Sequence, residues 1–155
     1  MSTAEAVAPR RPEPPVSELS RPFWEATRRR EYLLQWCSSC ETPIFYPREI
    51  CPACLGTQME WRPSRGSGEV HAVSVQHLPA AAFPAFSEGP YAVALIELAE
   101  GVRVMSNVVG CPPEEVTVGM QVTVTWEPLS DGRNLPLFEP AGQAGRSPAP
   151  AGSLG

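Results

Sequence analysis

The chain has 155 residues, of which 43% are hydrophobic, which suits one ordinary domain or two very small ones with a packed core. Its formal net charge is −5 and all twelve basic residues are arginines, which argues against bulk nucleic-acid binding and excludes Schiff-base chemistry on lysine. The sequence has neither a run of about 18 to 20 apolar residues nor a signal-peptide pattern, so we expect a cytoplasmic protein without membrane contact.

The two ends of the chain differ in composition from the rest. Residues 1–16 and 141–155 are rich in proline or small residues and poor in large apolar ones. We therefore expect a disordered leader over 1–16 and a disordered tail over 141–155.

A short helix is predicted over residues 20–31, from a capping serine and an early proline to a run of arginines that suits the helix dipole. It carries Phe23 and Trp24. These aromatics either pack on the chain itself, leaving the arginines in solvent, or fill a groove on another protein. Residues 32–36 then alternate with a period of two, which predicts a strand that runs into Cys37.

Four of the five cysteines form two CxxC pairs separated by ten residues: Cys37, Cys40, Cys51 and Cys54. A hairpin can bring two such pairs around one Zn²⁺, and four thiolates leave no coordination position for water or substrate. We therefore predict a structural zinc ion. Iron in a rubredoxin-like site is the chemical alternative, and two disulfides fit the expected compartment less well.

Other reactive residues do not form a catalytic pattern. Cys111 stands in a predicted loop with no histidine nearby, and His71 and His77 lie too far apart on one predicted strand to share a metal ion or a proton. GxSxG, HExxH, Walker and GxGxxG motifs are missing from the sequence. We expect no catalytic residues and no independent enzyme.

Beyond a Gly-rich join at residues 65–68, the pattern indicates an all-β unit. Five strands are predicted over 69–77, 91–98, 102–109, 121–126 and 135–139, with a tight hairpin at 99–101. Their number and length match a five-stranded Greek-key barrel of the OB type. The fold class is therefore mainly β, with the helix and zinc ribbon over 17–64 and the barrel over 65–140.

Two surface features suggest binding. The apolar loop 78–86 carries Phe83 and Phe86 outside any predicted strand, so it either folds over the barrel or meets a partner. Arginines on the helix and ribbon could also form an anion site for the phosphates of coenzyme A, namely Arg28, Arg29, Arg30, Arg48, Arg62 and Arg65.

Six stretches taken in order resemble one known family: FWEATRRREYLLQWCSSC, FYPREICPACLG, MEW, GSGEVHAVSV, VGMQVTV and LPLFEP. They are similar to proteins in which a rubredoxin-like zinc ribbon is joined to an OB-fold, the domain of unknown function thirty-five. The resemblance covers about residues 17–140. Two positions depart from it: Glu41 stands where a zinc knuckle often has Gly, and after Cys54 the glycine is delayed to Gly56.

The resemblance implies a non-catalytic accessory subunit. Similar proteins accompany thiolase-like condensing or retro-aldol enzymes, or enoyl-CoA hydratases, in acyl-CoA, steroid and polyketide-type metabolism, and contact with the coenzyme A moiety has been proposed for them. It also implies that the four cysteines of the CxxC pairs bind zinc. From the residues alone, a single-stranded nucleic-acid-binding module stays open as the alternative, and an independent hydrolase or redox protein as a third.

Overall fold

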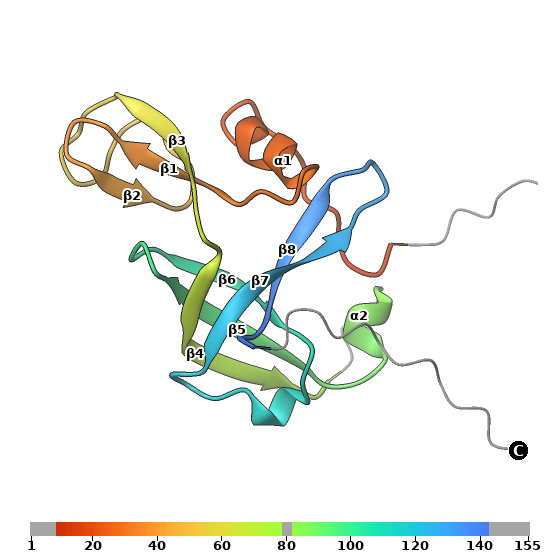
Figure 1. Cartoon of the computed structure of the whole chain (residues 1–155). Coiled ribbons are helices and arrows are strands. Elements are labelled where there is room, and N and C mark those ends of the chain that lie inside the picture. Colours follow the sequence, from red (N-terminus) through yellow and green to blue (C-terminus); the bar gives the residue numbers. More distant parts are fainter. Residues whose placement is uncertain (1–8, 79–81, 143–155) are drawn as a thin grey trace, which may run out of the picture.

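The computed structural model describes residues 9–78 and 82–142. A small three-stranded sheet is joined to a closed five-stranded barrel, and a short helix lies between the small sheet and one barrel strand (Figure 1). The predicted fold class, mainly β with a ribbon followed by an OB-type barrel, is confirmed.

The N-terminal half of the fold is the three-stranded ribbon sheet with its helix. Helix α1 spans Arg21–Thr27, β1 spans Leu33–Cys37, β2 spans Thr42–Ile44 and β3 spans Met59–Pro63. Strand β1 is central and pairs antiparallel with both neighbours. The alternation of residues 32–36 therefore marked the strand correctly, and its last residue is the first cysteine.

The barrel follows the strand order β4-β5-β6-β8-β7. Neighbours are antiparallel except for β6 and β8, which are parallel where Val108 meets Phe138, and this is the arrangement of the five-stranded Greek-key OB barrel. Two short helical turns, α2 (Pro84–Ser87) and the 3₁₀ turn η1 (Pro113–Glu115), lie in its loops. The strands are β4 (Ser67–Gln76), β5 (Tyr91–Leu98), β6 (Arg103–Val108), β7 (Gln121–Pro128) and β8 (Asn134–Pro140).

Strand β4 closes the barrel because it pairs with two strands. It runs along β5 and, at its beginning, also along β7. The register shifts between Val70 and Ala72, and such a bulge bends a strand. At Gly68 a Cβ atom would lie 2.4 Å from the carbonyl oxygen of Glu97, so only glycine fits this corner.

The ribbon and the barrel share one hydrophobic core. Alternate residues of β5 point inward, and Ile96 is completely buried. Tyr32 and Leu34, from the start of the ribbon, belong to the same cluster as barrel residues such as Phe138. The two parts therefore pack as one unit.

The helix is shorter than predicted. It ends at Thr27 instead of near Glu31, because Arg30 takes a left-handed conformation with φ 57° and the chain reverses there. The amide of Glu31 donates to the carbonyl oxygen of Ala26, which closes this turn. In the described ranges, no helix has the length and apolar character that crossing a bilayer requires.

Part of the predicted disordered leader packs on the barrel. Residues 9–16 are described, whereas 1–8 and the predicted tail from 143 onward lie outside the described residues. Arg11 is 9% exposed and forms an ion pair with Glu127, and the carbonyl oxygen of Pro14 accepts a hydrogen bond of 2.8 Å from Arg133. Composition alone does not predict these contacts, because Arg11 and Pro14 each lie more than a hundred residues from their partners in sequence. We call residues 10–14 the N-terminal strap.

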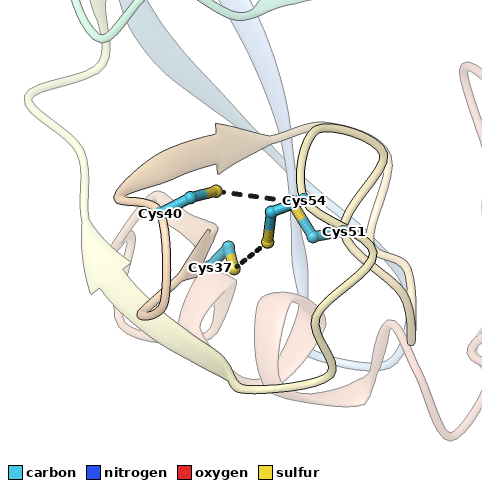
Figure 2. Close-up of side chains that lie close together, drawn as sticks. All are labelled: Cys37, Cys40, Cys51 and Cys54. Atoms are coloured by element: carbon cyan, nitrogen blue, oxygen red, sulfur yellow. Dashed lines mark hydrogen bonds between the residues drawn. The ribbon is translucent and has the colours of Figure 1, made fainter.

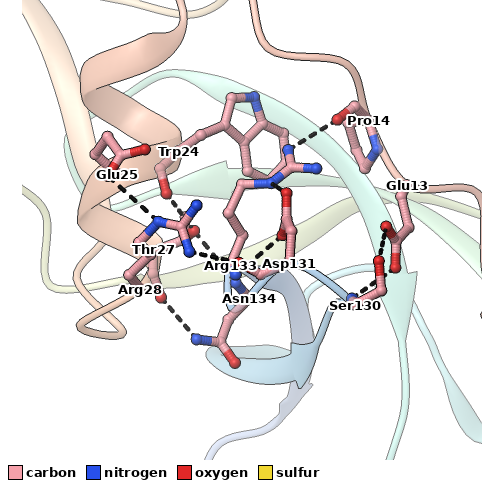
Figure 3. Close-up of polar contacts among 10 residues, drawn as sticks. All are labelled: Glu13, Pro14, Trp24, Glu25, Thr27, Arg28, Ser130, Asp131, Arg133 and Asn134. Atoms are coloured by element: carbon pink, nitrogen blue, oxygen red, sulfur yellow. Dashed lines mark hydrogen bonds and ion pairs between the residues drawn. The ribbon is translucent and has the colours of Figure 1, made fainter. Parts of the chain in front are cut away.

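A buried hydrogen-bond network joins α1 to β8 (Figure 3). The side-chain amide of Asn134 donates to the carbonyl oxygen of Thr27 at 2.8 Å, and Thr27 is fully buried. We expect Asn134→Ala to lower the free energy of unfolding by about 1–3 kcal/mol, because it leaves this carbonyl buried without a partner. Thr117→Ala, at an exposed site in the loop before β7, should change it by less than about 0.5 kcal/mol. Urea unfolding of both variants checks the difference, and equal effects would contradict it.

Candidate metal centre and its surroundings

The structure brings the four predicted ligands together. Cys37 and Cys40 come from the end of β1 and the turn after it, and Cys51 and Cys54 from the loop between β2 and β3 (Figure 2). Their sulfur atoms all lie within 4.8 Å of one another. The Sγ atoms of Cys37 and Cys54 are 3.6 Å apart, as are those of Cys40 and Cys51.

These separations fit a zinc ion. Four sulfurs placed tetrahedrally at about 2.3 Å from Zn²⁺ are about 3.8 Å from one another. Over the described ranges, this is the one group of three or more potential metal ligands close enough to share an ion. Because four thiolates fill a tetrahedral shell, the site would be closed and structural.

The two cysteine turns have the same backbone geometry. The amide of Glu41 donates to the carbonyl oxygen of Cys37 at 2.8 Å, and the amide of Leu55 donates to that of Cys51 at 2.9 Å. Both donors are left-handed, with φ of 58° and 63°. The two positions that depart from the family pattern thus keep the knuckle turn without a glycine, at some cost in strain.

The delayed glycine also has a function in the knuckle. The amide of Gly56 donates to the Sγ atom of Cys54 at 3.4 Å, and a Cβ atom at residue 56 would lie 3.2 Å from that sulfur. The backbone therefore passes close to the metal site here because residue 56 has no side chain.

Backbone amides favour the thiolate form of the buried ligands. Cys37 and Cys51 are fully buried, while Cys40 and Cys54 are exposed. The backbone N–H of Cys40 holds the pKa of Cys37 at about 7, and that of Cys54 lowers the pKa of Cys51. These hydrogen bonds favour the thiolate that a metal binds at Cys37 and Cys51, whereas at Cys54 the hydrogen bond from the Gly56 amide is outweighed by those from the other sulfurs, which raise its pKa to about 12.

The arginines expected to form a coenzyme A phosphate site have separate partners. Arg28 donates to the carbonyl oxygen of Asp131 at 2.5 Å and pairs with Glu25 (Figure 3). Arg29 pairs with Glu31. Arg62 pairs with Glu41 and Glu60, which raises its pKa, and lies over the ring of Trp36.

The other arginines of the expected patch lie elsewhere. Arg48 lines a hollow next to Arg103, and the backbone amide of Arg65 donates to Glu100 at 3.3 Å. Arg30 is an exposed residue at the end of the helical turn. The structure thus does not bring the predicted set into one cavity.

Three of the four predicted partner-binding aromatics line one cavity. They are Phe23, Trp24 and Phe86, whereas Phe83 is not in its wall. Phe23 is only 8% exposed and packs edge-to-face on Tyr32, so it belongs to the core of this chain and is not an exposed anchor. Within the loop predicted over 78–86, residues 79–81 lie outside the described residues.

Residues that the sequence pattern did not single out complete this cavity. Arg11 comes from the strap, and Phe45 and Tyr46 come from the loop between the cysteine pairs. The adjacent aromatics Phe45 and Tyr46 were a usable signal, since such side chains are rarely left without contacts. Arg11 gave no signal, because it stands in a proline-rich segment.

The other reactive residues considered from the sequence, two histidines and the fifth cysteine, do not belong to the cysteine cluster. His71 and His77 are both exposed on β4 or just after it, and Cys111 is half-buried in the loop before η1. Burial raises the pKa of Cys111, which disfavours a reactive thiolate.

A four-cysteine ribbon packed on an OB barrel defines the class of zinc-ribbon and OB-fold proteins. Residues 24–60 match the rubredoxin-like zinc ribbon domain of ChsH2, and residues 61–127 match its C-terminal OB-fold domain. The chain belongs to this family, which is also called DUF35.

Several relatives show how far the similarity extends. A probable enoyl-CoA hydratase alpha subunit of Thermomonospora curvata is 36% identical over 131 residues, which cover 84% of this chain and 40% of that protein. A DUF35 domain-containing scaffold protein of Methanocaldococcus jannaschii is 38% identical over 96 residues, or 61% of this chain and 67% of the relative. The chain thus spans well under half of the first relative.

Solved structures agree with the fold. A chain of an Ltp2-ChsH2(DUF35) aldolase superposes with a TM-score of 0.74 at 34% identity, covering 83% of this chain and 99% of that one. A DUF35 protein of Sulfolobus solfataricus shares the fold at 15% identity, with a TM-score of 0.54.

The metal site gives a direct prediction. We expect the wild-type protein to contain about one zinc ion per chain, and Cys51→Ser to lose it and unfold, because bound zinc stabilises small domains by on the order of 10 kcal/mol. Cys111→Ser is the matched control and should retain the metal, since residue 111 is not in the cluster. Elemental analysis and circular dichroism report the result. Full zinc occupancy in Cys51→Ser would contradict this assignment.

The strained knuckle gives a second prediction. Leu55 is 76% exposed and has φ of 63°, so its side chain adds strain without packing. Leu55→Gly should raise the free energy of unfolding of the zinc-loaded protein by about 1 kcal/mol. Gly56→Ala, one residue later, should lower it, because its Cβ meets the Cys54 sulfur. Denaturant unfolding tests both signs, and destabilisation by Leu55→Gly would contradict the strain.

Proposed function

We propose that this chain is a non-catalytic accessory subunit that binds a thiolase-like enzyme or an enoyl-CoA hydratase in acyl-CoA metabolism. The observation that carries the proposal is the superposition on a chain of an Ltp2-ChsH2(DUF35) aldolase, which covers 99% of that chain. The hydratase alpha subunit and the scaffold proteins among the relatives support the same kind of role.

The chemistry of the chain supports a role without catalysis. The cysteine cluster would leave its metal no open position, and Cys111 has a raised pKa. The two histidines are exposed and six residues apart in sequence. A partner enzyme would therefore supply the reacting groups.

The ribbon offers a surface for such a partner. Tyr46, Ile50 and Leu55, all from the segment between β2 and β3, are 61%, 54% and 76% exposed. Exposed apolar side chains on a small rigid element suit a protein interface. We assign the partner contact to this segment. Contact with coenzyme A is left out of the proposal, because the arginines expected to bind its phosphates do not converge on one site.

Co-expression tests this function. The full chain is produced with a thiolase-like or hydratase subunit of the same organism, and light scattering measures the mass of the product. We expect a stable complex, an active partner enzyme in it, and no acyl-CoA turnover by this chain alone. Turnover by the isolated chain, or a partner that is equally stable and active without it, would sink the proposal.

A charge on the ribbon surface tests the assigned contact. Ile50→Asp and Leu55→Asp together should weaken the complex at least about tenfold, because they place two carboxylates in an apolar interface. Val118→Asp, at a barrel residue that is 67% exposed, is the matched control. Equal affinities for the two variants, measured by titration of the purified partner, would remove the ribbon from the interface.

A further inference from the structure

A cavity of about 530 Å³ lies where four parts of the molecule meet. Its walls come from the N-terminal strap, helix α1, the ribbon loop after β2, and the barrel strands β5, β6 and β8. Small-molecule sites in proteins have volumes of about 300–1,000 Å³ and are mostly apolar. The size and the position between two structural units therefore suit a ligand site.

Aromatic rings form much of the wall. Phe23 and Trp24 pack edge-to-face at 5.1 Å, and the rings of Phe86 and Tyr91 lie 4.8 Å apart. Such mutual packing holds each ring in place. The aromatic lining consists chiefly of Phe23, Trp24, Phe45, Tyr46, Phe86 and Tyr91.

The strap closes one side and is held along its length. Arg10 pairs with Glu88 at 2.9 Å, Ser130 donates to the carboxylate of Glu13 at 2.6 Å, and Arg133 donates to the Pro14 carbonyl. The ion pair of Arg10 connects the strap to the end of α2. The other two contacts connect it to the turn between β7 and β8 (Figure 3). This wall thus needs no ligand to form it.

The cavity has no charge available for an ionic ligand. Arg11 is the one charged residue in its wall, and it is ion-paired with Glu127 and donates to Asn107 at 3.3 Å. Two of the uncharged polar side chains are also engaged: Ser106 donates to the Pro136 carbonyl oxygen at 3.1 Å, and Asn107 to that of Ala92 at 3.0 Å. An anion would have to compete with Glu127, so the lining favours an uncharged molecule.

From this we infer that the cavity binds a neutral, largely apolar small molecule that carries a ring able to pack against its aromatic wall. This site is separate from the metal centre, and of the three residues named on the ribbon surface assigned to a partner it includes Tyr46 but not Ile50 or Leu55. It does not rest on the proposed function, because the lining belongs to this chain alone.

A pair of fluorescent probes tests both the site and its preference for neutral ligands. N-phenyl-1-naphthylamine is neutral, and 1-anilinonaphthalene-8-sulfonate has the same ring system with a negative charge. We expect the neutral probe to saturate one site on the zinc-loaded full chain and the anionic probe to bind at least about tenfold more weakly, because a buried charge without a partner is unfavourable.

Two lining variants locate the site. Val93→Trp should abolish saturable binding by filling the cavity, and Phe86→Ala should weaken it by about three- to tenfold through loss of a ring in the wall. Val118→Ala, at an exposed apolar residue outside the lining, should bind like wild type. Zinc content and cooperative unfolding are measured for each protein. If Val93→Trp fails to fold, Phe86→Ala decides, since α2 is a short surface turn.

Three results would overturn the inference. They are the absence of saturable binding of the neutral probe, equal affinity for the two probes, and unchanged affinity in a folded lining variant. None of these results would bear on complex formation with an enzyme, so the two proposals can fail separately.

Discussion

The convergence of four cysteine sulfurs on one point is the constraint on which the ribbon depends. Among the described residues, its local apolar cluster consists of Cys37, Ile44 and Cys51, with Met59 packed against it, and two of these belong to the cysteine cluster that could hold the metal. So small a core cannot offset the conformational entropy lost on folding. A zinc ion bound by the four sulfurs supplies the missing free energy, as it does in other small zinc domains.

Strand β1 connects the cysteine cluster of the ribbon to the core of the barrel. Its last residue, Cys37, belongs to the cysteine cluster, while Leu34 and the preceding Tyr32 are buried in the core shared with the barrel. Arg133 adds a second connection, because it lies over the ring of Trp24 and pairs with Asp131 in the loop before β8. A partner that binds the ribbon would therefore also fix the orientation of the barrel relative to itself.

The sequence predicted those features that depend on local pattern. Cysteine spacing located the metal site, and alternation in segments such as 91–98 located the barrel strands within a few residues. Features that depend on contacts between distant residues escaped prediction. Arg11 pairs with Glu127, and Arg28 donates to the Asp131 carbonyl oxygen, because the tertiary fold brings these distant residues together. Composition alone instead predicted that the segment with Arg11 is disordered and that Arg28 belongs to an anion site.

The metal site and the apolar cavity are linked through the loop between the cysteine pairs. Phe45 and Tyr46 line the cavity and stand between Cys40 and Cys51, so the geometry of the thiolate cluster fixes both ends of the segment that carries them. Zinc would thus position one wall of a site that it does not touch. An ion with a closed coordination shell can therefore affect binding indirectly, because it determines which surfaces the chain presents. The exposed arginines contribute less to those surfaces, since many of them are held in ion pairs within the chain.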